Sequence, residues 1–182
     1  MKLLSGVVAL DGHDGAGKTT LARDLAEHIS GVYARPFQGA TGEALLAAGA
    51  AGDLDRLIEV GDGAIRAALD ASGRHRPVVL DRGWMTVASL CAGEPFEVFA
   101  ARWRLWIPTA LCWADLPTTL DRLSDRDEHP ETVAAHRHYL DVYRCLADRT
   151  DSLIVRTDLE SRQRCLGLLS DWVQRLPSVE RE

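Results

Sequence analysis

The chain has 182 residues, a formal net charge of −6 and 46% hydrophobic residues, with 19 arginines against only two lysines, Lys2 and Lys18. This length and hydrophobicity favour a single domain with one core, which excludes an intrinsically disordered protein. The negative balance, without a basic run, argues against binding a nucleic-acid polymer through its phosphates, because such binding needs a basic face. An anionic ligand must therefore be held by a local site.

The cysteines and the apolar runs indicate the cellular compartment of the protein. The four cysteines are widely spaced and form no CxxC pair, which favours reduced thiols in the core. No apolar run approaches the roughly 18 residues of a membrane span, and the short apolar run at the N-terminus runs straight into a glycine-rich loop, unlike a signal peptide. The sequence therefore predicts a cytoplasmic protein without a membrane partner.

Short apolar runs alternate with longer segments of helical period, which is typical of a parallel sheet covered by helices. The expected strands are Val7–Leu10, Val32–Arg35, Val78–Asp81, Ala110–Trp113 and Leu153–Arg156. The expected helices are Lys18–Ser30, Asp53–Ser72, Glu94–Trp106, Pro117–Arg126, Glu131–Asp148 and Leu159–Leu176. This order predicts a three-layer α/β fold with a five-stranded parallel sheet, in one domain over residues 1–177, with a frayed tail at 178–182.

Two of the expected helices carry unusual residues. Gly61 and Gly63 fall in the middle of Asp53–Ser72, where each costs about 1 kcal/mol relative to alanine. They indicate either a kink or a close approach to the helix backbone. The segment Glu94–Trp106 carries four aromatic residues at helical spacing, which favours a core position for them.

The segment from Gly12 to Thr19 fits the pattern GxxxxGK[ST] and lies between an expected strand and an expected helix, as a phosphate-binding loop requires. Backbone N–H groups of such a loop surround a polyphosphate, and the helix N-terminus adds partial positive charge. The expected phosphate-binding residues are Gly12, Gly15, Ala16, Gly17, Lys18, Thr19 and Thr20. Lys18 would reach the β- and γ-phosphates of ATP, and the Thr19 hydroxyl would bind Mg²⁺.

The available lysines and the residues after the third strand limit the types of reaction that the phosphate-binding loop could serve. The guanine-reading motif NKxD of GTPases is excluded, because the only lysines are at positions 2 and 18. Many ATPases place an acidic residue after the metal-binding Asp to activate water, whereas here Arg82 follows Asp81. Asp81 would then serve the Mg²⁺ ion, and Arg82 would reach an organic acceptor or the migrating phosphoryl group. The alternative is an ordinary surface ion pair.

Three blocks resemble the thymidylate kinase family of nucleoside-monophosphate kinases: GHDGAGKTT, LDRGW, and LDRLSDR followed by a helix with Arg137 and Tyr143. The resemblance runs from Val7 to about Leu169 and implies a P-loop kinase fold with a short lid at about residues 122–131. It further implies that Asp14 faces the acceptor, that Arg82 clamps the acceptor phosphate, and that Arg122 and Arg126 are lid arginines. A homodimer is also implied, and the aromatic segment around Phe99 and Trp103 would suit its interface.

The chain departs from this family around the acceptor. After the second strand it reads Arg35-Pro36-Phe37-Gln38-Gly39, in place of a Phe-Pro or Glu-Pro pair followed in some members by an arginine. The next helix lacks the usual Asn-Arg pair, although Arg66 is near. Either Arg35 and Arg66 replace the missing arginines, or the acceptor differs. Phe37 and Trp84 flank the expected acceptor pocket, where each would stack on a base or belong to the core.

The sequence thus predicts ATP- and Mg²⁺-dependent phosphoryl transfer to a nucleoside monophosphate, namely thymidylate or a related or modified pyrimidine nucleotide. The alternative is a kinase of a nucleoside or another small hydroxylated metabolite, and a third possibility is a P-loop protein that binds nucleotide without transferring phosphate. Deoxynucleoside kinases typically carry a Glu base where this chain has Arg35, so the arginine favours an anionic acceptor.

Overall fold

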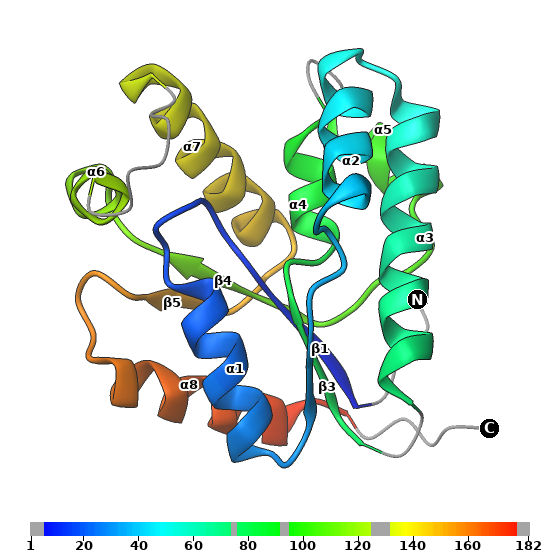
Figure 1. The fold of residues 1–182 in the computed structure, drawn as a ribbon. Helices are drawn as coiled ribbons and strands as arrows, with labels where there is room; N and C mark the ends of the chain where they lie inside the picture. Colours follow the sequence, from blue (N-terminus) through cyan, green and yellow to red (C-terminus); the bar gives the residue numbers. More distant parts are fainter. Residues whose placement is uncertain (1–5, 74–75, 92–94, 125–131, 178–182) are drawn as a thin grey trace.

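The computed structural model describes residues 6–73, 76–91, 95–124 and 132–177. They form a three-layer α/β fold around a parallel sheet of five strands in the order β2-β3-β1-β4-β5 (Figure 1). The strands are β1 (Val7–Asp11), β2 (Val32–Ala34), β3 (Val78–Asp81), β4 (Thr109–Trp113) and β5 (Ile154–Arg156). Each agrees with its predicted range to within one residue at either end, so the predicted fold class is confirmed. The predicted tail, 178–182, lies outside the described residues.

Successive side chains of a strand point to opposite faces of the sheet, and each face has its own hydrophobic core. Val7 and Ala9 of β1 point into one core, and Val8 and Leu10 point into the other. The second core is covered by α1 (Lys18–His28) and α8 (Arg162–Arg175). The first is covered by α2 (Ala40–Ala50), α3 (Leu54–Ser72), α4 (Trp84–Ser89), α5 (Phe96–Arg102) and α7 (Val133–Arg149), and α6 (Leu116–Ser124) contacts α7 (Figure 1).

Two helices escape sequence reasoning, α2 and α4. The α2 sequence is rich in alanine and has almost no amphipathic period, because hydrophobic residues occupy its whole circumference. The α4 segment is only six residues long, and five of them are buried, so no periodic pattern marks it. The predicted helix Glu94–Trp106 is shorter than expected: α5 ends at Arg102, and Trp103 continues in extended conformation.

The two mid-helix glycines have different surroundings. The α3 helix runs unbroken through both, so no break occurs there. A Cβ atom on Gly61 would lie 2.7 Å from Cγ2 of Val87 in α4, which shows that the two helices approach closely at this point. A Cβ atom on Gly63 would meet nothing within 4 Å, and nothing in the structure explains that glycine.

The aromatic residues of 96–106 pack together in the first core, as predicted, with Phe99 and Trp103 buried and Phe96 and Trp106 partly buried. The Phe99 and Trp103 rings stack with their centroids 5.2 Å apart, and these side chains are 1% and 0% exposed. Both side chains are covered within one chain, so neither is exposed to a partner subunit. The predicted homodimer stays a prediction. In the described ranges, no helix combines the length and the apolar character needed to cross a membrane.

Candidate active site

The phosphate loop joins β1 to α1 at the carboxyl end of the sheet (Figure 1). Its first glycine, Gly12, has a φ of 142°, and a Cβ atom there would lie 2.1 Å from the Cys112 carbonyl oxygen of β4. Gly17 adopts the left-handed conformation immediately before Lys18 begins α1. A glycine provides no side-chain cap, so the first N–H groups of α1, including that of the exposed Thr20, remain available to an anion.

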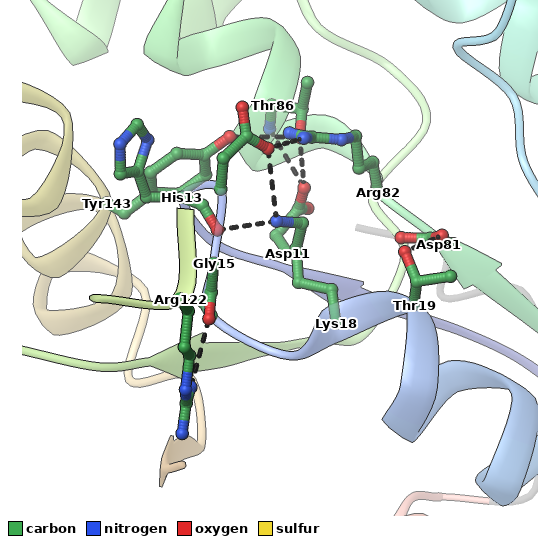
Figure 2. A network of polar contacts seen from close by, with 12 residues as sticks. Asp11, His13, Gly15, Lys18, Thr19, Asp81, Arg82, Thr86, Arg122 and Tyr143 are labelled. Atoms are coloured by element: carbon green, nitrogen blue, oxygen red, sulfur yellow. Dashed lines mark hydrogen bonds and ion pairs between the residues drawn. The ribbon is translucent and has the colours of Figure 1, made fainter. Parts of the chain in front are cut away.

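Lys18 lies inside the loop rather than in solvent, with 5% of its surface exposed. Its Nζ donates a 2.6 Å hydrogen bond to the His13 carbonyl (Figure 2). It also lies 3.8 Å from Oδ1 of Asp14. Burial, together with the nearby Arg82 guanidinium, lowers the Lys18 pKa to about 8. A polyphosphate entering the loop would therefore offer this ammonium a stronger partner than the carbonyl that it contacts.

Thr19 and Asp81 form the predicted metal-binding pair. The Thr19 hydroxyl donates a 2.7 Å hydrogen bond to Oδ2 of Asp81, across the gap between α1 and β3. The same carboxylate accepts a hydrogen bond from the Tyr33 hydroxyl, and Nε of Arg35 lies 3.4 Å from it. A hydroxyl and a carboxylate are oxygen ligands suited to Mg²⁺. These two side chains therefore fit the cation that the loop motif implies.

Arg82, directly after β3, places its positively charged guanidinium group beside the phosphate loop. Its guanidinium forms an ion pair with Asp14, and its backbone N–H donates to the Leu10 carbonyl. Partial burial favours the neutral form of Asp14, but the charges of Arg82 and Lys18 outweigh it and lower the Asp14 pKa to about 2. Arg82, Asp14 and Lys18 thus lie together, as the sequence predicts.

Asp11, which sequence reasoning missed, holds the turn after Arg82. Its carboxylate is completely buried and accepts hydrogen bonds from the backbone N–H groups of Gly83, Met85 and Thr86, and from the Thr86 hydroxyl at 2.6 Å. Burial raises the Asp11 pKa despite these bonds. The available signal was an acidic residue ending an otherwise apolar strand, because a carboxylate in that position needs several donors.

Arg122 extends from α6 to the opposite side of the loop. It donates to the Gly15 carbonyl at 3.0 Å and to Oγ1 and the carbonyl of Thr157. Thr157 in turn donates to the carbonyl of Ala16. The predicted lid arginine is thus joined to the phosphate loop. Arg126 and the rest of the predicted lid up to residue 131 lie outside the described residues, and α6 itself ends at Ser124.

The predicted acceptor residues do not all converge. Trp84 is 3% exposed, donates from Nε1 to the Ile107 carbonyl and packs on Trp106, so of its two predicted positions it occupies the core and not the acceptor pocket. Arg66 bonds Asp62 one turn earlier on α3, and its predicted contact with the acceptor phosphate gains no support from this position. Phe37 is partly buried against the first core. Arg35 joins the site through Asp81.

Comparison with known proteins relates the chain to kinases through structure alone. No protein-family model and no curated protein sequence matches it. The solved structure of deoxyadenosine kinase from M. mycoides with dCMP and a flexible dCDP has a TM-score of 0.62 at 10% identity, covering 94% of this chain and 100% of the kinase. YorR protein from Bacillus subtilis, in complex with phosphorylated GDP, has a TM-score of 0.63 at 14% identity, covering 92% and 95%.

The same kinase from M. mycoides with bound dATP has a TM-score of 0.61 at 11% identity and covers 92% of this chain. Each likeness spans nearly the whole domain, at identities where only the fold is shared. The chain therefore has the P-loop kinase fold, with its phosphate loop, Asp81 and Arg82 assembled at the carboxyl edge of the sheet.

Proposed function

We propose that the protein transfers the γ-phosphoryl group of ATP to a small-molecule acceptor, with a nucleoside monophosphate such as thymidylate or a related pyrimidine nucleotide as the leading candidate. The observation that carries this proposal is the convergence of Lys18, the Thr19–Asp81 pair and Arg82 around one loop. Thr19 and Asp81 would hold Mg²⁺, which neutralises charge on the phosphates. Positioning and electrostatics of this kind supply most of the catalysis in phosphoryl transfer.

The state of Asp14 favours an acceptor that is already anionic. A carboxylate with a pKa of about 2 is a weak proton acceptor, so Asp14 is poorly suited to activate a hydroxyl group or water. A phosphate monoester has its second pKa at about 6 and presents ionised oxygens at neutral pH without help from a base. Arg82 would bind such an oxygen while Lys18 binds the donor.

A second candidate is a kinase of a nucleoside or another small hydroxylated metabolite. It is favoured by the pairing of Arg35 with Asp81 and of Arg66 with Asp62, because two arginines expected at an acceptor phosphate already have partners within the chain. The structural likeness to a deoxyadenosine kinase agrees with this candidate. A non-catalytic nucleotide-binding protein is disfavoured by the assembled Lys18, Thr19 and Asp81.

The test supplies the purified protein with ATP and Mg²⁺ and, separately, with thymidylate, thymidine and a panel of other nucleotides and nucleosides. ADP is measured by a coupled assay, and the phosphorylated product by mass spectrometry. We expect ADP and thymidine diphosphate in equal amounts when thymidylate is present. Transfer to thymidine but not to thymidylate would establish the second candidate, and ADP formation independent of every acceptor would sink the kinase proposal.

Replacement of Lys18 by methionine checks that the loop is the donor site. We expect transfer to fall by about 10²- to 10³-fold, the usual loss when one group that stabilises the transition state is removed. The fold should survive, because the replaced ammonium is buried and burial disfavours its charge. Circular dichroism measures the fold, and Arg56→Ala on the exposed face of α3 is the matched control. Substantial residual turnover in Lys18→Met would place the chemistry elsewhere.

A further inference from the structure

Two buried histidines join the phosphate loop to α7. Nε2 of His13 lies 2.7 Å from Nδ1 of His136, although 123 residues separate them in the chain. The two residues are 6% and 4% exposed. The Tyr139 ring lies against the His13 ring, with the centroids 5.6 Å apart and the planes inclined by 13°. Buried polar contacts of this kind fix the orientation of both rings.

A hydrogen bond between two ring nitrogens needs one of them to donate and the other to accept. Burial, opposed in part by the charge of Asp14, lowers the His13 pKa to about 4. His13 is therefore uncharged at neutral pH, and either tautomer of the pair satisfies both ring nitrogens at the contact. An apolar residue at either position would leave a buried ring nitrogen without its partner, at a cost in stability.

The His13 peptide also holds the donor-site lysine. Its carbonyl oxygen accepts the 2.6 Å hydrogen bond from Lys18 Nζ, so the same residue contacts α7 through its ring and Lys18 through its backbone. A displacement of the His13 ring would move this carbonyl and, with it, the ammonium. Misplacement of a reacting group by about 1 Å costs as much as 10²-fold in rate.

The same helix also reaches the Arg82 side of the site. Tyr143 follows His136 by seven residues, two helical turns, so both face the same way. The Tyr143 hydroxyl lies 3.1 Å from Oγ1 of Thr86, which donates to the buried Asp11 carboxylate that holds the turn after Arg82. One face of α7 therefore contacts both the phosphate loop, which precedes Lys18, and α4, the helix that follows Arg82.

We propose that His13 and His136 are positioning residues, whose hydrogen bond fixes the phosphate loop on α7 and thereby sets the place of Lys18 relative to Arg82. This inference rests on the proposed phosphoryl transfer, because it assigns Lys18 to the donor phosphates. It predicts that the pair governs the binding of ATP and the rate of transfer, and leaves the affinity for the acceptor unchanged.

The variants separate the hydrogen bond from simple loss of packing. His136→Asn keeps a polar atom near the position of Nδ1, whereas His136→Leu removes it. His13→Gln keeps a polar atom near the position of Nε2, whereas His13→Leu removes it. His138→Leu is the matched control, since His138 is exposed on the same helix two residues from His136. All are measured well below their melting temperatures, with circular dichroism to show that they are folded.

We expect each leucine variant to weaken Mg·ATP binding and to lower kcat about tenfold, with an unchanged KM for the acceptor. The asparagine and glutamine variants should recover most of this loss, and the double leucine variant should be no worse than either single one. Calorimetry with Mg·ATP needs no acceptor, so it tests the positioning even if the proposed acceptor is wrong. Intact binding without transfer by the wild-type protein counts against the proposed function alone.

Two results would overturn the inference. One is Mg·ATP binding and turnover in folded His13→Leu and His136→Leu that match His138→Leu. The other needs no variant: a hydrogen bond between two nitrogens gives a scalar coupling between the ¹⁵N nuclei of His13 and His136 in the wild-type protein. Its absence would overturn the proposal whether or not the leucine variants fold.

Discussion

Arg82 is held in a backbone conformation that arginine rarely adopts. Its φ is 81°, in the left-handed region, which costs a residue with a Cβ atom about 1–2 kcal/mol relative to the ordinary region. The residue stays there because the Leu10 carbonyl takes its N–H and Asp14 takes its guanidinium. The strain therefore serves to bring the guanidinium beside the phosphate loop.

Two substitutions at this position separate the strain from the chemistry. Arg82→Ala and Arg82→Gly both lose the guanidinium, so we expect both to lower kcat by about 10²-fold and to raise the acceptor KM. Arg82→Gly should be more stable than Arg82→Ala by about 1 kcal/mol, because glycine accepts a positive φ. Steady-state kinetics and urea unfolding measure the two effects, with Arg144→Ala on α7 as control. Unchanged kinetics in both variants would give Arg82 a purely structural role.

At the scale of an element, the two glycines of α3 provide a matched pair. Gly63→Ala should stabilise the protein by about 0.5–1 kcal/mol, because alanine is the better helix former and its Cβ meets nothing within 4 Å. Gly61→Ala should instead destabilise it by about 1–3 kcal/mol, because the new Cβ would lie 2.7 Å from Cγ2 of Val87. Thermal unfolding compares them. A Gly61→Ala variant as stable as Gly63→Ala would contradict the close packing of α3 on α4.

Two aspartates accept hydrogen bonds at helix N-termini, Asp11 at α4 and Asp53 at α3, and they differ in burial and in the number of donors. In the wild type the donors at the start of α4 all face the Asp11 carboxylate, and Asp11→Asn would replace one of its acceptor oxygens with an NH₂ group. We therefore expect the free energy of unfolding to fall by about 2–3 kcal/mol and the first turn of α4 to be less stable. Asp53→Asn changes the exposed cap of α3, where a single N–H from Arg56 is accepted, and should cost under about 0.5 kcal/mol. Urea unfolding of the two variants tests this contrast. Equal losses would show that the buried network contributes nothing beyond an ordinary cap.

Sequence patterns predicted those elements that carry their own signal. β1 is an apolar run between two glycines, β3 is one between Pro77 and Arg82, and the loop at Gly12–Thr19 has fixed spacing, so each is predicted from local residues. The helix α2 has no amphipathic period, so it was missed. For Trp84 the sequence left the acceptor pocket and the core as alternatives, and only the packing of α4 shows that its ring lies in the core.

Other parts of the site depend on contacts between distant segments. No local pattern indicates that His136 meets His13, or that Thr86 bonds Asp11, because each pair is joined only when the sheet is assembled. The lid arginines show both outcomes. Arg122 lies against the loop that the resemblance implied, whereas Arg126 lies outside the described residues and stays a prediction.

At the scale of the whole molecule, His13 makes stability depend on pH. The groups around its ring are Asp14, Lys18, Arg82, His136 and Tyr139. An unfolded histidine has a pKa of about 6.5 and binds a proton that the folded His13, with a pKa of about 4, does not. The unfolded state therefore gains protons as the pH falls from about 6.5 to 4, and the free energy of unfolding decreases by up to about 3 kcal/mol.

Urea unfolding between pH 7 and pH 4 measures this effect. His13→Gln should flatten the decrease in this window, and His28→Gln on α1 is the matched control. Asp14 contributes in a separate pH range. Its pKa is about 2 in the folded state and about 3.8 in the unfolded state, so it lowers the stability of the protein only as the pH falls below about 3.8. Identical pH profiles for the wild type and His13→Gln would show that His13 is not kept neutral by the fold.

The strand order has a consequence for how the chain is made. β1 leads directly into the phosphate loop, yet its two neighbours in the sheet, β3 and β4, begin only at Val78 and Thr109. During synthesis this completely buried strand has both edges open until β3 leaves the ribosome, and one edge open until β4 does. Non-local pairing of this kind folds slowly. Nascent or truncated chains that stop before β4 will therefore expose the edge of β1 that β4 covers, and we expect them to bind chaperones or to aggregate.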